Sequence, residues 1–411
     1  MTVVPLARAV DRGGADDQAL KRAVHRRLVL EHGDEPAPDG AELRVRLAQL
    51  LRDEHPLLPA ARLDRLVGEL VDEVAGLGPL EPLLGDPEVT EVMVNGPGRA
   101  FVERRGALEA VELGLDADAI VALVERVVAP LGLRLDRASP MVDARLADGS
   151  RLHAVIPPLA IDGPCITIRR FGARTLTLDD FGAPPGARAF LEWAVAAGWN
   201  LLVAGATSAG KTTLLNTLAS AIPRAARVVT IEETAELRLA LAHVVRLEAR
   251  PANAEGAGAV SVRDLVRAAL RMRPDRLVVG EVRGGEALDM LQAINTGHDG
   301  SLCTIHSNGP ADALRRLETL AMMAGSGLPL APVRAQITAS VDAVVFVARR
   351  ADGVRRIEAI AEVVDGERSD AGPTVMPCFE WRGGSLVPLG VHPTRGARVP
   401  DALRPASEWF R

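Results

Sequence analysis

A glycine-rich loop with a lysine and two threonines carries the clearest chemistry in this sequence. Residues 205–213 read Gly-Ala-Thr-Ser-Ala-Gly-Lys-Thr-Thr and fit the pattern G-x-x-x-x-G-K-[ST]. An apolar run precedes the loop and a helical pattern follows it, which is the context that supports such a match. Its backbone N–H groups and the helix N-terminus are expected to bind phosphate oxygens. The predicted nucleotide-binding residues are Gly205, Ala206, Thr207, Ser208, Ala209, Gly210, Lys211, Thr212 and Thr213.

Two side chains of this loop have expected roles beyond binding. Lys211 should reach the β- and γ-phosphates of a nucleoside triphosphate, and the Thr212 hydroxyl should bind Mg²⁺. The alternative is a turn rich in small residues that binds nothing. The flanking strand and helix patterns argue against that alternative, so the sequence predicts a protein that binds ATP with Mg²⁺.

Carboxylates follow two further apolar runs. Glu281 ends the run 276–281, and we expect it to polarise the water that attacks ATP, directly or through Mg²⁺. Glu232, Glu233 and Glu236 follow a second run and supply oxygen ligands of the kind that Mg²⁺ prefers. The sequence does not show which of the three points inward. Solvent-exposed acids at a strand end or at a helix N-terminus are the alternatives.

Two histidines flank another apolar run. His298 and His306 lie eight residues apart, which is wider than the usual spacing of a zinc-binding pair. Either could sense the γ-phosphate, although a structural hydrogen bond is the commoner role of a single histidine.

Arginines form the remaining set of candidates. Arg263, Arg267 and Arg271 recur at intervals of four on one helical face, which fits either a solvated surface or a row that faces phosphate. Arg151 and Arg169 fall in a smaller domain and could act as arginine fingers if that domain folds over the nucleotide.

Composition limits the class of protein. The chain has 411 residues, of which 48% are hydrophobic and only 3% aromatic, with no Tyr, so its cores should consist of Leu, Val, Ala and Ile. A net charge of −6 argues against a protein whose main task is to bind nucleic-acid backbone. The three cysteines include no CxxC pair, which indicates buried thiols in a reducing compartment. No signal peptide or spanning helix is apparent, so we expect a cytoplasmic protein.

The order of patterns along the chain predicts an α/β fold with several parts. From about residue 187, strands alternate with helices, which is typical of a three-layer, RecA-like P-loop domain. A smaller α+β domain with antiparallel strands precedes it. The predicted divisions are an N-terminal helical segment (1–60), the α+β domain (61–174), a linker (175–186), the ATPase domain (187–390) and a loose tail (391–411).

Four ordered motifs resemble those of the type II/type IV secretion ATPase superfamily. They are residues 205–213 for the Walker A motif, 230–237 for the Asp box, 270–283 for the Walker B motif and 295–306 for the His box. Residues 76–84 and 91–96 resemble the N-terminal domain of the CpaF branch, the ATPases of tight-adherence (Flp-type) pili. The resemblance covers roughly residues 64–365.

The resemblance implies a homohexameric motor at the cytoplasmic face of the inner membrane. ATP would lie between the two domains, and hydrolysis would drive pilus assembly or secretion through an inner-membrane platform protein, with peripheral membrane association through that partner. It implies that Glu281 is the catalytic glutamate, that Glu232, Glu233 and Glu236 are the Asp-box acids, and that His298 and His306 are the His-box residues. Arg151, Arg169, Arg267 and Arg271 resemble the arginines of the family that contact the nucleotide.

The sequence departs from the family at two points. Glu233 stands where the Asp box usually has Asp, and the tetracysteine zinc insert common in type II secretion ATPases is absent from the sequence. The second departure favours the CpaF or type IV secretion branches. Two other functions are weighed against the motor: a nucleic-acid-stimulated RecA-like ATPase such as a helicase, and an ATP-binding scaffold or regulator. The acidic charge and the scarcity of aromatic residues argue against specific nucleic-acid binding.

Overall fold

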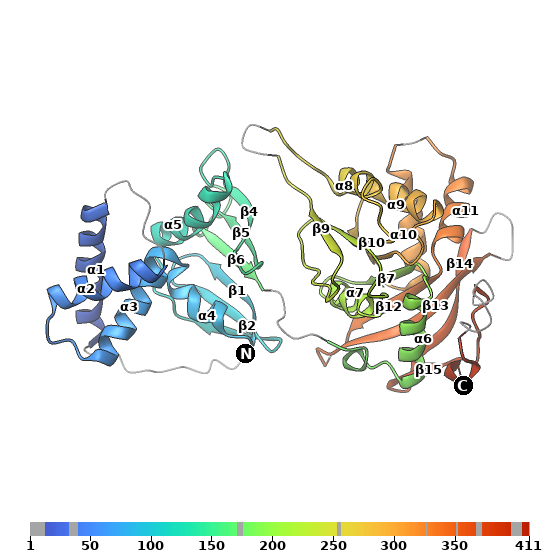
Figure 1. The fold of residues 1–411 in the computed structure, drawn as a ribbon, viewed down its shortest axis with the longest axis horizontal. Helices are drawn as coiled ribbons and strands as arrows, with labels where there is room; N and C mark the ends of the chain where they lie inside the picture. The colour runs from blue at the N-terminus through green and yellow to red at the C-terminus, as the bar shows by residue number, and fades with distance from the viewer. Residues whose placement is uncertain are drawn as a thin grey trace. The chain divides into compact units, whose positions relative to one another are not determined.

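The computed structural model describes residues 13–32, 40–170, 176–252, 256–325, 327–350, 352–366, 372–395 and 405–410. Parts of the predicted N-terminal segment, linker and tail therefore lie outside the described residues. The chain divides into two compact units, Met1–Ala173 and Arg174–Arg411 (Figure 1).

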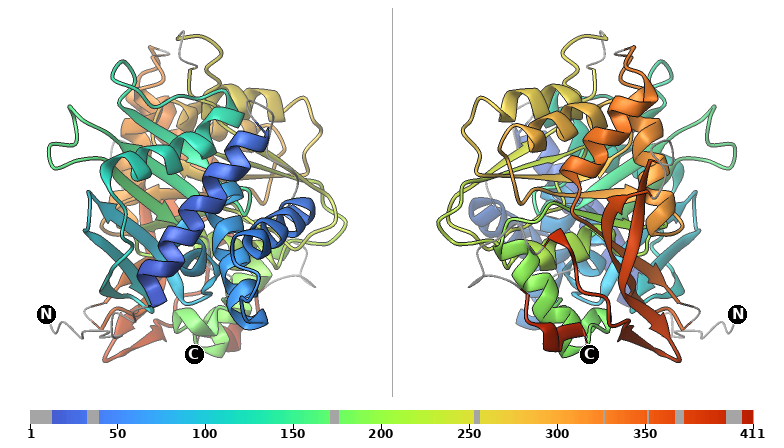
Figure 2. Two further views of the ribbon diagram at one scale, coloured as in Figure 1. Left: turned by 90° about the vertical axis from the view of Figure 1, so that its left-hand side faces the viewer. Right: turned by 90° about the vertical axis from the view of Figure 1, so that its right-hand side faces the viewer.

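Three helices at the start of the first unit share one hydrophobic core. They are α1 (Gly13–His32), α2 (Gly40–Glu54) and α3 (Ala60–Ala75), drawn in blue in Figure 2. Leu43 and Leu47 of α2 pack with Leu66 and Leu70 of α3, and all four are fully buried. This shared core joins α3 to the N-terminal helices, whereas the predicted division at residue 60 separated them.

An antiparallel sheet forms the rest of the first unit. Its strand order is β3-β2-β1-β6-β5-β4. Helix α5 (Ala117–Val128) packs its apolar residues, among them Ile120 and Leu123, into the same core as the buried residues of the strands. The strands are β1 (Val89–Asn95), β2 (Ala100–Arg104), β3 (Ala107–Val111), β4 (Met141–Arg145), β5 (Arg151–Val155) and β6 (Cys165–Arg169), and the short α4 (Glu81–Gly85) precedes them.

A nine-stranded sheet runs through the second unit in the order β15-β14-β13-β12-β7-β11-β10-β8-β9. The strands from β12 to β9 in this order are parallel to one another, and β13 to β15 add an antiparallel edge. The parallel strands are β7 (Leu201–Gly205), β8 (Val228–Glu232), β9 (Val244–Glu248), β10 (Arg276–Val282), β11 (Leu302–His306) and β12 (Ala343–Arg349). The antiparallel ones are β13 (Arg355–Asp365), β14 (Pro373–Arg382) and β15 (Ser385–Pro388).

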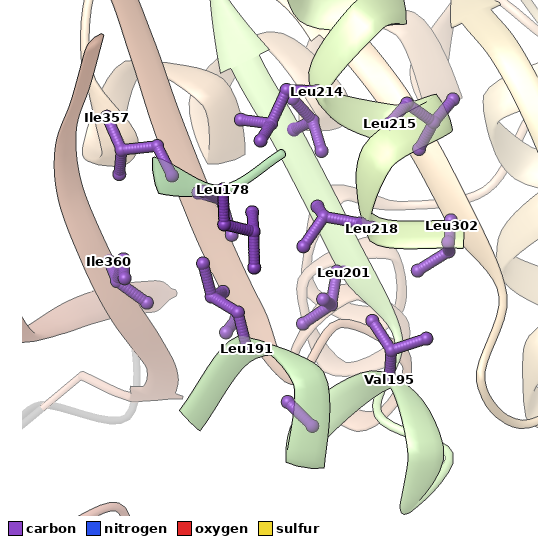
Figure 3. Packing of buried hydrophobic residues seen from close by; sticks show 14 of the residues in the cluster. Leu178, Leu191, Val195, Leu201, Leu214, Leu215, Leu218, Leu302, Ile357 and Ile360 are labelled. Atoms are coloured by element: carbon purple, nitrogen blue, oxygen red, sulfur yellow. The ribbon is translucent and has the colours of Figure 1, made fainter. Parts of the chain in front are cut away.

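Helices cover both faces of this sheet, which confirms the predicted three-layer α/β fold. The helices α6 (Pro185–Ala196) and α7 (Lys211–Ala219) pack on one face around Leu201 of β7 (Figure 3). The other face carries α8 (Val262–Ala269), α9 (Glu286–Asn295), α10 (Pro310–Met322) and α11 (Leu330–Ser340). In Figure 2, α10 and α11 lie side by side in orange.

The few aromatic residues gather in the second unit rather than being absent from the cores. Phe190 of α6 lies 5.6 Å from Trp199, 6.0 Å from Phe379 and 5.2 Å from Phe410, measured between ring centroids. All of these side chains are buried. Most buried residues of this core are Leu, Val, Ala and Ile, as the composition predicted, and four phenylalanines are among its largest fully buried side chains.

Two segments predicted to be irregular contribute to this core. Leu178 and Phe181 of the predicted linker are buried, so the residues described from 176 onward belong to the second unit. The tail was predicted to be loose, but Phe410 is fully buried and Arg395 is 6% exposed, with its guanidinium 2.6 Å from Asp342. Edge-on and tilted aromatic contacts of Phe410, together with this ion pair, attach the described parts of the tail to the second unit. Among the described residues, no helix is long and apolar enough to cross a membrane.

Candidate active site

The parallel strands bring the predicted site residues to one edge of the sheet. The carboxyl ends of parallel strands share an edge, which is where ligands bind in open α/β sheets. Along that edge, Gly205 ends β7, His306 ends β11, Glu281 lies near the end of β10 and Glu232 ends β8. Gly205 and His306 are direct register partners. The strand order therefore places the loop, the histidine and the two acidic segments next to one another.

The glycine loop between β7 and α7 has the backbone that close approach to phosphate requires. Gly210 has a φ of +96°, and a Cβ there would lie 2.8 Å from Cδ of Arg355. A Cβ at Gly205 would lie 2.4 Å from the carbonyl oxygen of Val347. Ser208 also has a positive φ, of 60°. The loop turns directly into α7, whose first N–H groups lack intrahelical partners and can bind an anion.

Lys211 joins the loop to the neighbouring strand ends. Its Nζ donates to the carbonyl oxygen of Ala206 at 3.1 Å and lies 3.6 Å from Oε1 of Glu281. The hydroxyl of Thr207 lies 3.4 Å from Nδ1 of His306. The loop, Glu281 and His306 thus form one contiguous site.

A bulge in β10 places Glu281. The pairing of β10 with β11 shifts register between Val279 and Val282, and an extra residue of this kind re-aims a side chain at a strand end. The hydroxyl of Thr304 donates to the carbonyl oxygen of Gly280 at 2.6 Å and holds the bulge. The Glu281 side chain is 23% exposed, so its carboxylate can meet both the loop and water.

Glu232 has a structural role that separates it from the other two acids. It is 2% exposed, and its carboxylate accepts N–H bonds from Glu236 at 2.9 Å and from Leu237 at 3.0 Å. Burial raises its pKa to about 7, against the opposing effect of these two bonds. A Cβ at Gly280 would lie 2.8 Å from its Cγ, so only glycine leaves room for it. Glu232 therefore fixes the turn that carries Glu233 and Glu236.

Glu233 is the acid of this group that connects to Glu281. The guanidinium of Arg283 donates to Oε2 of Glu233 at 2.6 Å and, through Nε, to Oε2 of Glu281 at 2.8 Å. The neighbouring carboxylates hold the pKa of Arg283 above its usual value, although partial burial opposes them. Sequence reasoning missed Arg283, because its partners become visible only when β8 and β10 are known to be neighbours.

The donor set fits Mg²⁺ bound together with a nucleotide. The Thr212 hydroxyl lies in the first turn of α7, Glu281 lies near the end of β10, and Glu233 follows the neighbouring β8, so every donor is an oxygen. Within the described ranges, no three Asp, Glu, His or Cys side chains are grouped closely enough to hold a metal ion by themselves. Mg²⁺ commonly takes one or two protein oxygens and completes its shell with phosphates and water, so the two findings are compatible.

His298 lies at the opposite edge of the sheet. It precedes β11, whereas His306 ends that strand. Its Nδ1 lies 2.9 Å from the carbonyl oxygen of Ala293, the distance of a hydrogen bond near the end of α9. The structure therefore does not bring His298 to the glycine loop, and the observed contact is the structural one that was weighed against phosphate sensing.

The arginine row of α8 is bound to the neighbouring helix. Arg263 and Arg267 each place Nε on one carboxylate oxygen of Asp289 in α9, at 2.6 and 2.8 Å. Asp289 is 8% exposed, so the pair of arginines compensates a buried charge. Arg271 follows the helix and is exposed. Two alternatives were predicted for this row, a solvated surface and a face toward phosphate. Arg263 and Arg267 show neither, because both bind Asp289.

Arg151 and Arg169 lie in the first unit. They are register partners on the adjacent strands β5 and β6, so both project from the same face of that sheet. Nη2 of Arg151 lies 3.2 Å from Asp143. The alternate residues Leu152 and Ile168 point to the other face and are buried.

Comparison with known proteins gives one family. The family described as "Type II/IV secretion system protein" matches residues 73–367. A putative conjugal transfer protein of Mycobacterium tuberculosis is 41% identical over 309 residues, which cover 72% of this chain and 87% of the relative. The type IV secretion system protein PtlH of Bordetella pertussis is 38% identical over 308 residues, covering 67% and 91%.

A solved structure shows a similar fold. The X-ray structure of the Legionella pneumophila ATPase DotB aligns with a TM-score of 0.51 and 22% identity, covering 70% of this chain and 80% of that one. At this identity the similarity concerns the fold alone.

Proposed function

Because the chain belongs to the type II/IV secretion system protein family and is a P-loop ATPase of that family, we propose that it is a hexameric motor. Its ATP hydrolysis would power the assembly of a Flp/Tad-type pilus, as in the CpaF branch, or a type IV secretion machine. It would work at the cytoplasmic face of the inner membrane on a platform protein of that machine. The relatives named for conjugal transfer and type IV secretion support the secretion alternative.

The proposal depends above all on the pairing of Lys211 with Glu281. A lysine of a glycine loop and a carboxylate two strands away are brought to 3.6 Å between Nζ and Oε1. Phosphoryl transfer to water needs a cation at the γ-phosphate and a group that orients the attacking water. This pair supplies both at one point of the sheet edge.

Each residue of the site would have its own role in ATP hydrolysis. The N–H groups of residues 206–213 would bind the phosphates, and Lys211 would exchange its bond to Ala206 for one to the γ-phosphate. Glu281 would orient and polarise the water, while His306 would contact the γ-phosphate from the next strand end. When bound, Mg²⁺ would neutralise charge on the β- and γ-phosphates. Thr212 and Glu233 or Glu236 would hold it.

The arginines of the first unit complete this proposal. Arg151 and Arg169 would act as arginine fingers, and Arg267 and Arg271 would contact the nucleotide. An arginine on the transition state typically supplies a large share of the rate. Arg151→Ala and Arg169→Ala are therefore expected to lower kcat in the assembled protein.

We predict that turnover requires both Lys211 and Glu281. Glu281→Gln removes the group that polarises water, so kcat should fall by roughly 10²–10⁴-fold while ATP still binds. Lys211→Ala should weaken ATP binding as well as turnover. The measurement is the ATPase rate across a size-exclusion profile, with binding of a fluorescent ATP analogue measured in parallel.

The proposal predicts that turnover in the wild-type protein coincides with a hexamer-sized peak. Rates equal to wild type in both variants would refute the assigned site. A fully active monomer would refute the hexameric motor, and stimulation by single-stranded nucleic acid would point to the helicase-like alternative. Arg382→Gln is the control, because Arg382 is exposed and pairs with Glu380 on β14, which is three strands from β7 in the sheet.

A further inference from the structure

Arg283 lies between the carboxylates of two neighbouring strand ends. Its Nε and Nη2 lie 2.8 and 2.5 Å from Oε2 of Glu281, and its Nη1 lies 2.6 Å from Oε2 of Glu233. Glu281 belongs to β10, and Glu233 directly follows β8. The guanidinium thus makes a bridge across the two strands with nearly planar, forked donors, a geometry that lysine cannot reproduce.

The backbone of Arg283 is itself held in place. Oε1 of Glu286, the first residue of α9, accepts N–H bonds from Arg283 at 2.6 Å and from Gly284 at 2.7 Å. The side chain of Arg283 therefore extends from a turn that hydrogen bonds hold in place, although the side chain itself is 60% exposed. An exposed single ion pair contributes little to stability, so the value of this bridge lies in orientation rather than in folding.

Both oxygens of Glu281 have cationic neighbours on opposite sides. Oε1 faces Lys211 at 3.6 Å, while Oε2 faces Arg283. A carboxylate held at one oxygen only can rotate about its terminal torsion, which is a broad one. The second contact fixes that torsion, and the link to Glu233 fixes the guanidinium in turn.

We propose that Arg283 is a positioning residue: it ties Glu281 to Glu233 and thereby fixes the orientation in which Glu281 serves the ATPase reaction. This inference rests on the proposed function, in which Glu281 polarises water. Arg283 itself touches neither substrate nor the reacting atoms in this account. A displacement of about 1 Å in a catalytic group can cost about 10²-fold in rate, so a loss of this size is plausible for a purely orienting contact.

The first test separates orientation from binding. Arg283→Gln should lower kcat by about 10–100-fold and leave both KM and the dissociation constant of a fluorescent ATP analogue within about twofold. Arg283→Lys keeps the charge without the fork and should recover part of kcat. An unchanged kcat, or a loss confined to KM, would overturn the proposal.

A matched control comes from β14. Arg382 places Nε 2.8 Å and Nη2 2.6 Å from Oε2 of Glu380, which lies two residues earlier, as Glu281 does before Arg283. The exposed fractions of the two arginines are 62% and 60%. Arg382→Gln should therefore leave kcat unchanged, because it breaks the same kind of pair on a strand that is three places from β7 in the sheet.

A double-mutant cycle tests the link to Glu233. If Arg283 and Glu233 act as one unit, Arg283→Gln/Glu233→Gln should lose no more kcat than the worse of the single variants. If the losses multiply, Glu233 acts independently of Arg283, for example on the metal alone, and the proposed link is wrong.

Failure of the proposed function can be told apart from failure of this inference. If the wild-type protein binds ATP but shows no turnover, the motor proposal fails. Crystal structures of the wild-type protein and of Arg283→Gln, both with Mg²⁺ and ADP, then still test the bridge. A Glu281 carboxylate that changes its orientation when Arg283 is replaced would support the bridge, and one that keeps its orientation would overturn it.

Discussion

At the scale of single residues, the most informative side chain is Glu232, whose orientation the sequence left open. Glu232 was grouped with the metal-binding acids, but its carboxylate is buried and accepts backbone N–H bonds. Three acids within five residues do not reveal which one turns inward. The distinction depends on Gly280 of the neighbouring strand, whose missing side chain makes room for Glu232.

The buried Glu232 predicts a measurable dependence of stability on pH. Its pKa is about 7 in the folded protein against an ordinary value of 4.5. Between these two values the native state binds more protons than the unfolded state, so this group's contribution to stability falls as pH rises from about 4.5 to about 7. The full change amounts to about 3–4 kcal/mol.

The variant Glu232→Gln should lack this decline, because glutamine cannot ionise. Urea denaturation at a series of pH values, without nucleotide or metal, measures the free energy of unfolding of both proteins. That of the wild type should fall relative to that of the variant as pH rises. Glu233→Gln is the matched control, since Glu233 is exposed and its removal should leave the decline in place. Parallel curves for wild type and Glu232→Gln would contradict the prediction.

At the scale of elements, the sequence predicted most of the second unit, because its strands are apolar runs between turn residues. It failed where an element lacks that signal. Strand β3 reads Ala-Leu-Glu-Ala-Val and is almost wholly exposed at a sheet edge, so neither alternation nor an apolar run marks it. The predicted linker likewise contains Pro and Gly, but Leu178 and Phe181 bury it against the core.

The site was predictable in part for the same reason. Motif spacing placed the glycine loop, Glu281 and His306 at strand ends, where the parallel arrangement brings them together. The spacing could not show that His298 lies at the opposite edge of the sheet, or that Asp289 accepts a hydrogen bond from Arg263. Contacts of this kind depend on which elements are neighbours, which a single sequence does not state.

Arg276 connects three elements and yields a prediction at this scale. It begins β10 and is 8% exposed, and its guanidinium donates to the carbonyl oxygens of Val195 at 2.6 Å and Ala196 at 3.3 Å near the end of α6, and to that of Gly300 at 3.3 Å. Burial lowers its pKa, which marks the desolvation that these bonds offset.

Arg276→Gln should lower the free energy of unfolding by about 2–3 kcal/mol, because buried carbonyl groups lose their donors. Since the residue lies at the edge opposite the glycine loop, ATP affinity should not change. Circular dichroism in urea and a nucleotide-binding assay measure the two effects. A loss of ATP affinity beyond what the unfolded fraction of the variant accounts for would contradict the placement of Arg276 at the edge opposite the glycine loop. Arg382→Gln serves again as the exposed control.

At the scale of the whole molecule, the two units have separate hydrophobic cores. Phe410 is fully buried in the second unit, and Leu47 is fully buried among the N-terminal helices of the first. Phe410→Ala and Leu47→Ala should each cost about 2–5 kcal/mol, but in different units.

Differential scanning calorimetry should therefore show each variant lowering a different transition. Phe410→Ala should shift the transition of the second unit, and Leu47→Ala that of the first. If both variants shifted a single common transition, the units would be thermodynamically coupled and the prediction would be wrong. Val45→Ala is the control for Leu47, because Val45 lies on the same helix and is 71% exposed.

The aromatic residues of the second unit also have a spectroscopic consequence. The chain has four tryptophans and no tyrosine, and Trp193, Trp199, Trp381 and Trp409 all belong to the second unit. Intrinsic fluorescence therefore reports on the ATPase unit alone, with no engineered label. Emission changes on adding nucleotide can be assigned to that unit directly. The first unit, which carries Arg151 and Arg169, has no tryptophan or tyrosine, so a fluorophore must be introduced there to follow it.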